Sequence, residues 1–172
     1  MTKESNYPIR ELGAEDAAEF KALRLKGLKE EPDAFGSSFE ESEPLPLSTF
    51  AKRIASDQNG FVLGAFDKNL VGMTGFYRYK DGKKSEHKGV LWGVYLLPEY
   101  RGKGIAKRLM LGVIEKARSL PGIELIHLGV NPANVPVVKL YESVGFVKWG
   151  EEKHALKVDG HYVDEDQMVL WL

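Results

Sequence analysis

Residues 94–109 decide the fold of this chain, and they read Val94-Tyr95-Leu96-Leu97-Pro98-Glu99-Tyr100-Arg101-Gly102-Lys103-Gly104-Ile105-Ala106-Lys107-Arg108-Leu109. The apolar run that ends at Leu97 is typical of a strand buried on both faces. Pro98 ends this strand, because proline cannot donate to a strand ladder. Apolar residues then recur at helical spacing from Ile105 to about Leu120. The stretch therefore predicts a strand, a glycine-bearing turn and the N-terminus of a helix.

A turn of this kind is suited to bind a phosphate group. Backbone N–H groups at a helix N-terminus have no partner in the helix, and the helix dipole favours an anion there. Gly102 and Gly104 let an anion approach the backbone, and Lys103, Lys107 and Arg108 add positive charge. The turn is not a P-loop, because no Gly-Lys-Ser/Thr closes it, and it lacks a full Gly-x-Gly-x-x-Gly.

The composition predicts one ordinary globular domain over residues 1–172. There is no cysteine, which excludes disulfides and thiolate chemistry, and the four histidines are scattered, so we expect no metal site. The formal net charge of −1 gives no electrostatic case for nucleic acid or a membrane surface as a partner. Residues 1–9 contain no signal peptide and no apolar run reaches spanning length, so a cytoplasmic protein is expected.

The whole chain predicts an α/β fold with seven strands and four helices. We expect strands over 7–12, 61–66, 70–79, 87–97, 123–130, 146–158 and 161–172, and helices over 16–29, 47–56, 103–120 and 135–143. The first helix carries a stripe formed by Ala17, Phe20, Leu23, Arg24, Gly27 and Leu28. Hairpins alternate with strand–helix–strand crossovers, so the elements should form one twisted mixed sheet with helices on both faces.

Two motifs of the C-terminal half resemble those of the GCN5-related N-acetyltransferases (GNAT). Arg101–Ala106 is similar to the pyrophosphate-binding signature of that family. It is followed, in the family's order and separation, by Asn134, by Leu140-Tyr141-Glu142 and by Gly145-Phe146. The predicted order of strands and helices is also the family's order. The resemblance implies a GNAT-like fold in which the two strands that flank helix 103–120 are parallel and splay apart to admit the cofactor.

The resemblance also implies an enzyme, an N-acetyltransferase that transfers acetyl from acetyl-CoA to a primary amine of a small molecule or peptide by direct attack in a ternary complex. The implied cofactor-binding residues are Val94, Tyr95, Leu96, Arg101, Gly102, Lys103, Gly104, Ile105, Ala106 and Asn134. In the family, backbone N–H groups hold the pyrophosphate, and an N–H from the preceding strand polarises the thioester carbonyl. Asn134 has two compatible interpretations, a helix N-cap and a contact to the pantetheine arm.

Tyr141 is the candidate general acid, which would protonate the leaving thiolate. It follows Asn134 by seven residues, which places both on one helix face. A phenol, with a pKa of about 10, is a weaker acid than a thiol of about 8.5. The hydroxyl would therefore act as a hydrogen-bond donor to the thiolate, or the site would lower its pKa. The alternative is an amphipathic tyrosine of the core.

The general base is not evident. Many relatives place a glutamate on the strand before the phosphate loop, and Val90 stands about where that acid would fall. The candidates are Glu86, His87, Glu40 and Glu41, or a chain of water molecules.

Residues 30–43 hold six acidic residues and no Lys or Arg. Pro, Gly and Ser in this segment predict a loop, and a solvated connector is the plain interpretation. Phe35 and Phe39 instead indicate that the segment packs onto something, and in the family it lies over the acceptor end of the cleft. We therefore expect Phe35, Phe39, Glu40 and Glu41 to bind the acceptor, which would carry a further positive charge or be a basic peptide.

Two other functions stay open for this sequence. One is a non-catalytic CoA-binding sensor or regulatory domain on the same fold, which the missing base supports. The other is a phosphate- or nucleotide-binding module unrelated to CoA. The chain would be a monomer, or a homodimer formed through the edge of the C-terminal hairpin.

Overall fold

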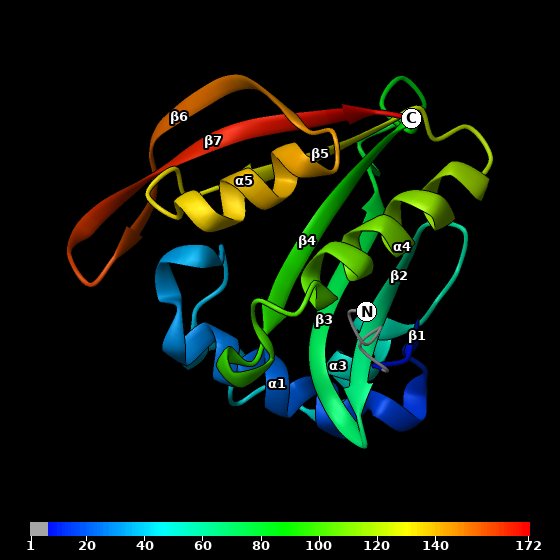
Figure 1. Ribbon diagram of the computed structural model, residues 1–172, viewed down its shortest axis with the longest axis vertical. Helices are drawn as coiled ribbons and strands as arrows, with labels where there is room; N and C mark the ends of the chain where they lie inside the picture. The colour runs from blue at the N-terminus through cyan, green and yellow to red at the C-terminus, as the bar shows by residue number, and fades with distance from the viewer. Residues whose placement is uncertain (1–6) are drawn as a thin grey trace, which may run out of the picture.

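The computed structural model describes residues 7–172; residues 1–6, which belong to the segment in which no signal peptide is expected, lie outside the described residues. Seven strands form one sheet in the order β1-β2-β3-β4-β5-β7-β6 (Figure 1). All neighbours are antiparallel except β4 and β5, which are parallel. The strands are β1 (Ile9–Glu11), β2 (Gly60–Asp67), β3 (Asn69–Arg78), β4 (Lys88–Leu96), β5 (Leu125–Val130), β6 (Val147–Val158) and β7 (His161–Trp171).

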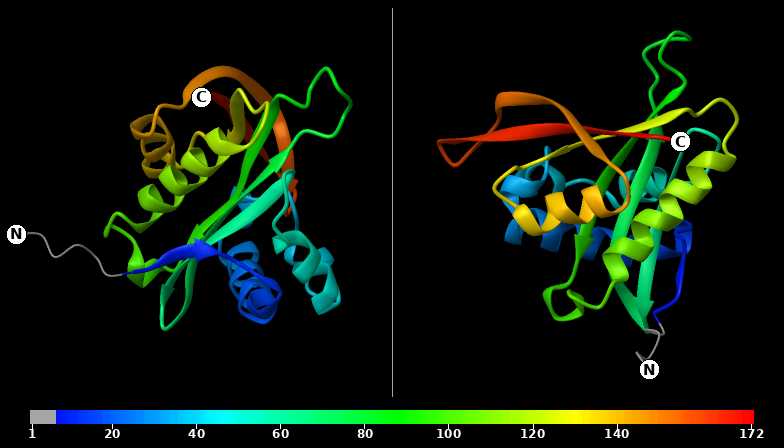
Figure 2. Two further views of the ribbon diagram at one scale, coloured as in Figure 1. Left: turned by 90° about the vertical axis from the view of Figure 1, so that its right-hand side faces the viewer. Right: turned by 45° about the horizontal axis from the view of Figure 1, so that its top comes forward.

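Helices cover both faces of this sheet, as the sequence predicted (Figure 2). α4 (Ile105–Ser119) and α5 (Val135–Ser143) lie on one face, and α1 (Ala17–Glu30), α2 (Phe39–Ser42) and α3 (Leu47–Ile54) lie on the other. Each helical layer buries its own hydrophobic core against the sheet. None of the helices within residues 7–172 combines the length and the hydrophobicity that a membrane span requires.

The acidic segment that follows α1 is not the continuous loop that the sequence predicted. It contains a 3-10 turn, η2 (Pro32–Ala34), and the short helix α2. Ser38 begins α2, because its Oγ accepts a hydrogen bond from the Glu41 N–H at 3.2 Å. Ser-x-x-Glu is a helix-start signal that the sequence contains. Phe35 is buried against the core beneath α1, so the segment is anchored to the protein.

The middle of the sheet opens where β4 and β5 separate. The two strands pair only between Lys88–Val90 and Leu125–His127, and the rest of β4 runs away from β5 (Figure 1). β4 also carries a bulge, because Gly93 and Val94 together oppose Thr74 of β3. Gly93 has a φ of 66°, which favours glycine. This separation leaves a gap that β4, α4 and α5 can line.

Candidate active site

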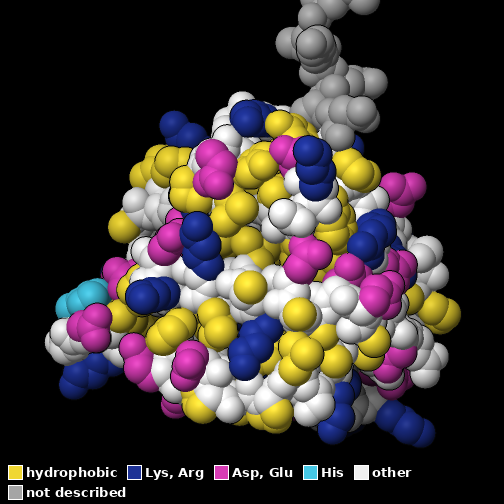
Figure 3. Space-filling model, turned by 90° about the horizontal axis from the view of Figure 1, so that it is seen from below, with side chains coloured by type: hydrophobic (Ala, Val, Ile, Leu, Met, Phe, Trp, Pro, Cys, Tyr) yellow, Lys and Arg dark blue, Asp and Glu magenta, His cyan; other side chains and the backbone are white. Residues whose placement is uncertain are grey.

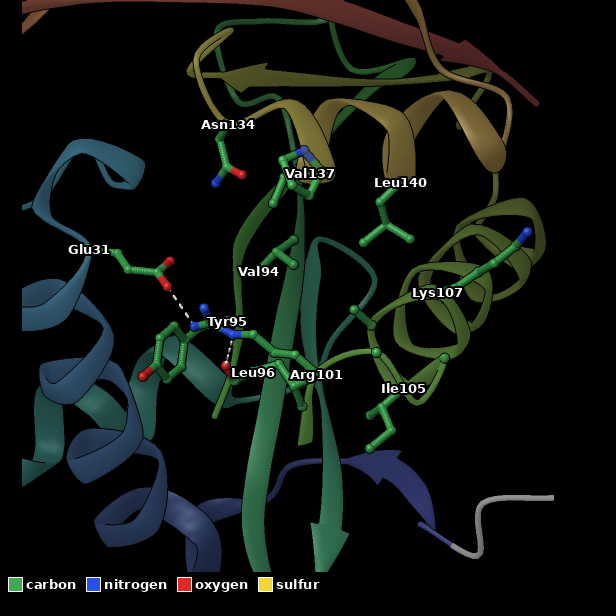
Figure 4. Close-up of a pocket in the computed structure, with 14 residues that line it drawn as sticks. Glu31, Val94, Tyr95, Leu96, Arg101, Ile105, Lys107, Asn134, Val137 and Leu140 are labelled. Carbon is green, nitrogen blue, oxygen red and sulfur yellow. Dashed lines mark hydrogen bonds and ion pairs between the residues drawn. The ribbon is translucent and has the colours of Figure 1, made fainter. Parts of the chain in front are cut away.

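A cavity of about 450 Å³ lies between the end of β4, the start of α4 and the face of α5 (Figure 4). Nine of the ten predicted cofactor-binding residues line it, namely Val94, Tyr95, Leu96, Arg101, Gly102, Gly104, Ile105, Ala106 and Asn134. The cavity adds residues that were not predicted to bind, which are Glu31, Lys107, Pro136, Val137 and Leu140. The predicted residues therefore share one cavity, although they come from three separate parts of the chain, and Glu31 adds a fourth.

The N-terminus of α4 forms one wall of this cavity. Gly104 is the N-cap residue, with a φ of 75° and no side chain to cap the helix. The first hydrogen bond of the helix runs from the Arg108 N–H to the Gly104 carbonyl, at 3.1 Å. The amides of residues 104–107 therefore have no partner in the helix, and they donate to no other group in the described part of the chain. Several N–H donors at a helix N-terminus make this wall suitable for an anion.

Arg101 and Lys103, the two predicted basic residues of the turn, have different positions. The Arg101 Nε donates to the Leu96 carbonyl at 2.9 Å, and its Nη2 pairs with the Glu31 carboxylate at 2.5 Å. Lys103 does not line the cavity, and its Nζ lies 5.1 Å from the centre of the Tyr100 ring. Arg101 and Glu31 thus pair on the side of the cavity nearest α1 (Figure 4).

α5 supplies the opposite wall. Asn134, Val137 and Leu140 point from this helix into the cavity (Figure 4). Asn134 occupies the N-cap position, but its side chain makes no capping hydrogen bond, so the N-cap interpretation is wrong for the side chain. The amide group of Asn134 thus remains available to a ligand in the cavity.

Tyr141 follows Leu140 but is not among the residues that line the cavity, and its ring belongs to the core. It is 6% exposed, and its ring packs edge-on against Phe146 with ring centres 5.9 Å apart. Burial raises the pKa of its phenol above the usual value, which is the opposite of the lowering that would favour full proton transfer. The hydroxyl makes no hydrogen bond within residues 7–172, and it is not among the enclosed polar atoms that lack a partner, so a ligand can reach it.

A second tyrosine, Tyr95, already uses its hydroxyl in a hydrogen bond. It lines the cavity, but its hydroxyl donates to the Glu30 carboxylate at 2.7 Å. Burial, together with this hydrogen bond, raises the pKa of Tyr95 as well. Of the two phenols, Tyr141 is the one whose proton is not already engaged.

Glu86 and His87, two of the candidates for the general base, lie too far from the cavity to act there. They precede β4, whereas the cavity lies beside Val94–Leu96 at its other end. Seven residues of strand separate His87 from Val94, which corresponds to about 23 Å at roughly 3.3 Å per residue. Glu31 carries the one carboxylate among the described lining residues, and it is paired with Arg101. No group of three potential metal ligands lies together within residues 7–172.

The predicted acceptor residues line a second cavity of about 710 Å³, between the acidic segment and the tip of the β6–β7 hairpin. Phe35, Phe39, Glu40 and Glu41 all border it. The Arg24 guanidinium lies 4.7 Å from the Phe35 ring and the Lys29 ammonium 5.6 Å from the Phe39 ring. The protein's own cations thus occupy one face of each ring, while both carboxylates remain exposed.

The hairpin also contacts the acidic segment directly. His161 of the hairpin contacts Asp33, with 3.1 Å between Nε2 and Oδ1, which joins the hairpin to the acidic segment. Figure 3 shows the face of the molecule seen from below Figure 1, where acidic and basic side chains are interspersed among hydrophobic ones.

Comparison with known proteins agrees with this geometry. Residues 25–146 match the model of the acetyltransferase (GNAT) family. The N-alpha-acetyltransferase RimI of Mycobacterium tuberculosis is 30% identical over 122 residues, which are 71% of this chain and 73% of that protein. The spermidine N(1)-acetyltransferase of Vibrio cholerae is 28% identical over 134 residues, which are 77% of this chain and 73% of that protein.

Solved structures share the whole architecture. A GNAT-family acetyltransferase from Streptococcus pneumoniae superimposes with a TM-score of 0.85 at 25% identity, covering 97% of this chain and 100% of the other. yncA, a putative acetyltransferase from Salmonella typhimurium solved with its cofactor acetyl-CoA, superimposes with a TM-score of 0.80 at 20% identity, covering 98% of this chain and 95% of the other. The second comparison supports the fold alone.

Proposed function

Because the chain belongs to the acetyltransferase (GNAT) family, we propose that it transfers the acetyl group of acetyl-CoA to a primary amine of a small molecule or peptide. The observation that carries this proposal is the cavity beside the end of β4 that separates from β5, walled by the unpaired amides at the start of α4. RimI and the spermidine acetyltransferase, both similar to this chain, are named for acetylation of amines.

In this proposal the cavity holds the cosubstrate along its length. The amides at the start of α4 bind the pyrophosphate, as expected for an anion at a helix N-terminus. The pantetheine arm lies between Val94–Leu96 of β4 and the Val137 and Leu140 side chains of α5, and the Asn134 amide hydrogen-bonds to it. The Salmonella protein, which has the same fold, binds acetyl-CoA.

The chemistry requires a polarised carbonyl, a neutral amine and a proton for the thiolate. A backbone N–H near the bulge at Gly93 and Val94 polarises the thioester carbonyl. The amine nitrogen attacks the carbonyl carbon, the C–S bond breaks, and the Tyr141 hydroxyl hydrogen-bonds to the thiolate as it forms. The carboxylate in the cavity is already paired, so the amine loses its proton through water.

The alternative is a CoA-binding sensor without catalysis. The two functions are separated by incubating the protein with acetyl-CoA and a pool of amines and measuring release of free CoA. An acetyltransferase releases CoA in proportion to the amine present. Binding of acetyl-CoA by calorimetry without amine-dependent release would identify a sensor.

For the acceptor, we propose that Glu40 and Glu41 attract a positive charge beyond the amine that reacts. Both carboxylates are exposed at the second cavity, where exposed charges act over about 8–10 Å at physiological ionic strength. Glu40→Gln/Glu41→Gln should raise the KM of a cationic acceptor about threefold, in keeping with the small energies of exposed charge pairs. The KM of acetyl-CoA should stay the same, and the effect should shrink as salt is added.

Glu115→Gln/Glu142→Gln is the matched control, because it removes the same charge from exposed positions on α4 and α5. An equal effect of both double variants, or no effect of the first, would show that Glu40 and Glu41 do not contact the acceptor.

A further inference from the structure

Arg24 occupies an unusual position on α1. The buried side of this helix is formed by Ala17, Phe20, Leu23, Arg24, Gly27 and Leu28. Arg24 is only 5% exposed, so a positive charge lies in the middle of an apolar helix face. Arginine is almost never buried to this extent unless a partner balances its charge.

The described part of the chain offers Arg24 no such partner. Its Nε and Nη1 atoms are enclosed and make no hydrogen bond. The guanidinium lies between two rings, 4.7 Å from the centre of Phe35 and 5.6 Å from that of Trp92. Contacts with ring faces stabilise a cation but leave its N–H donors unsatisfied.

The electrostatic environment of Arg24 also favours an anionic ligand. Burial, and to a smaller extent the positive charge of Arg53, lowers the pKa of Arg24 to about 10. The guanidinium nevertheless stays protonated at neutral pH. A buried cation without a counter-ion is destabilising, and an anion that reached it would be held strongly. The third nitrogen, Nη2, is not among the enclosed atoms, so a ligand would meet it first.

The position of Arg24 relates it to the reaction. Its Nη1 lies 3.4 Å from the place that a Cβ on Gly93 would occupy. Gly93 belongs to the bulge of β4, directly before the cavity-lining residues Val94–Leu96. The Phe35 ring, which stacks on Arg24, also borders the second cavity. Arg24 itself lines neither cavity, so an anion on it would lie beside the β4 backbone at Gly93, next to residues that line the two cavities.

We infer that the acceptor is an amine that carries a carboxylate close to the reacting nitrogen, as an α-amino acid does, and that Arg24 binds this carboxylate. The inference rests on the proposed function and specifies its substrate class. The carboxylate pairs with the guanidinium and is not consumed. The ammonium loses a proton, its nitrogen bonds to the acetyl carbon, and CoA leaves as the thiol. The rest of the acceptor extends over Phe35 toward Glu40 and Glu41, where a second positive charge would be accommodated.

The test compares each α-amino acid with its own α-amide as acceptor, which changes the carboxylate and keeps the side chain. For the best side chain, the wild-type kcat/KM should favour the acid at least tenfold. This result would be informative, because the amine of an amide has the lower pKa and would react faster if the carboxylate were not recognised. Equal rates, or a preference for the amide, would overturn the inference.

Arg24→Met tests the residue itself, because it keeps a long side chain against Phe35 and removes the charge. The preference for the acid over the amide should fall to about one, through a higher KM for the acid, with an unchanged affinity for acetyl-CoA. Arg24→Lys should restore part of the preference. A purely structural role would instead lower both rates equally, and an unchanged preference in Arg24→Met would overturn the assignment.

Lys26→Met is the matched control, since it removes the same charge from the exposed side of the same helix. It should leave the preference as in the wild type. The inference and the proposed function fail in distinguishable ways. Acetylation of amines without regard to a carboxylate overturns only the inference, whereas a protein that acetylates no amine at all overturns both.

Discussion

Replacement of Tyr141 by phenylalanine should lower kcat about 100-fold, because a positioned proton donor contributes about 10²–10⁴ to a rate. The ring and its packing against Phe146 are kept, and only the hydroxyl is lost. That hydroxyl is bonded to no group in residues 7–172 and is not among the enclosed polar atoms that lack a partner, so its removal should not lower the melting temperature. The measurement is steady-state release of CoA with the best acceptor, together with calorimetry of acetyl-CoA binding, which should change less than about twofold.

Tyr100→Phe removes the same atom from a tyrosine whose hydroxyl bonds to Asp67 at 2.9 Å, and it serves as the matched control. A Tyr141→Phe variant that turns over like Tyr100→Phe would identify Tyr141 as a residue of the core and nothing more.

The pH profile of kcat gives an independent check on Tyr141. Burial raises the pKa of its phenol above the reference value of about 10, so the donating, protonated form persists to higher pH. Ionisation of Tyr141 should therefore not lower the wild-type kcat between about pH 7 and 10. Any fall in this range should also be seen in Tyr141→Phe. A fall in this range that disappears in the variant would mean that the phenol ionises there, and hence that its pKa is not raised.

The parts of the fold that the sequence predicted well carry local signals. α5 has the predicted bounds, because Pro136 suits the first turn of a helix and Gly145, with a φ of 105°, suits the residue after its end. The β6–β7 hairpin turns at Asp159 and Gly160, both with positive φ, as Asp-Gly predicts. The prediction placed the start of α4 two residues too early, because Gly104 caps the helix instead of belonging to it.

The parts of the site that were missed depend on contacts between distant segments. Glu31 reaches Arg101 across 70 residues of sequence, and no local pattern indicates that pair. The sequence alone could have excluded His87 as the general base, because the rise per residue of a strand fixes the distance between His87 and Val94. Arg24 is recognisable in the sequence as a charge inside an otherwise apolar helical stripe. That its enclosed nitrogens have no hydrogen-bond partner depends on the tertiary structure, which the sequence does not show.

Gly104→Val tests the other end of the cavity and should weaken acetyl-CoA binding at least tenfold, or about 1.4 kcal/mol. A Cβ at Gly104 would have no heavy atom within 4 Å, so the new side chain would project into the open space in front of the α4 amides. In the proposed complex the pyrophosphate occupies that space. The substitution also strains the backbone, because a φ of 75° is unfavourable for valine by about 1–3 kcal/mol.

Gly122→Val separates the strain from the obstruction. Gly122 lies just beyond the other end of α4, has a φ of 74°, and would place its Cβ no closer than 3.9 Å to another atom, Nη1 of Arg78. Both variants should therefore lose similar thermal stability, whereas only Gly104→Val should lose affinity in calorimetry with acetyl-CoA. Equal affinities of the two folded variants would place the pyrophosphate elsewhere. A loss in Gly104→Val alone would mean that the anion meets the unpaired amides at the start of α4, which is the physical basis of the whole assignment.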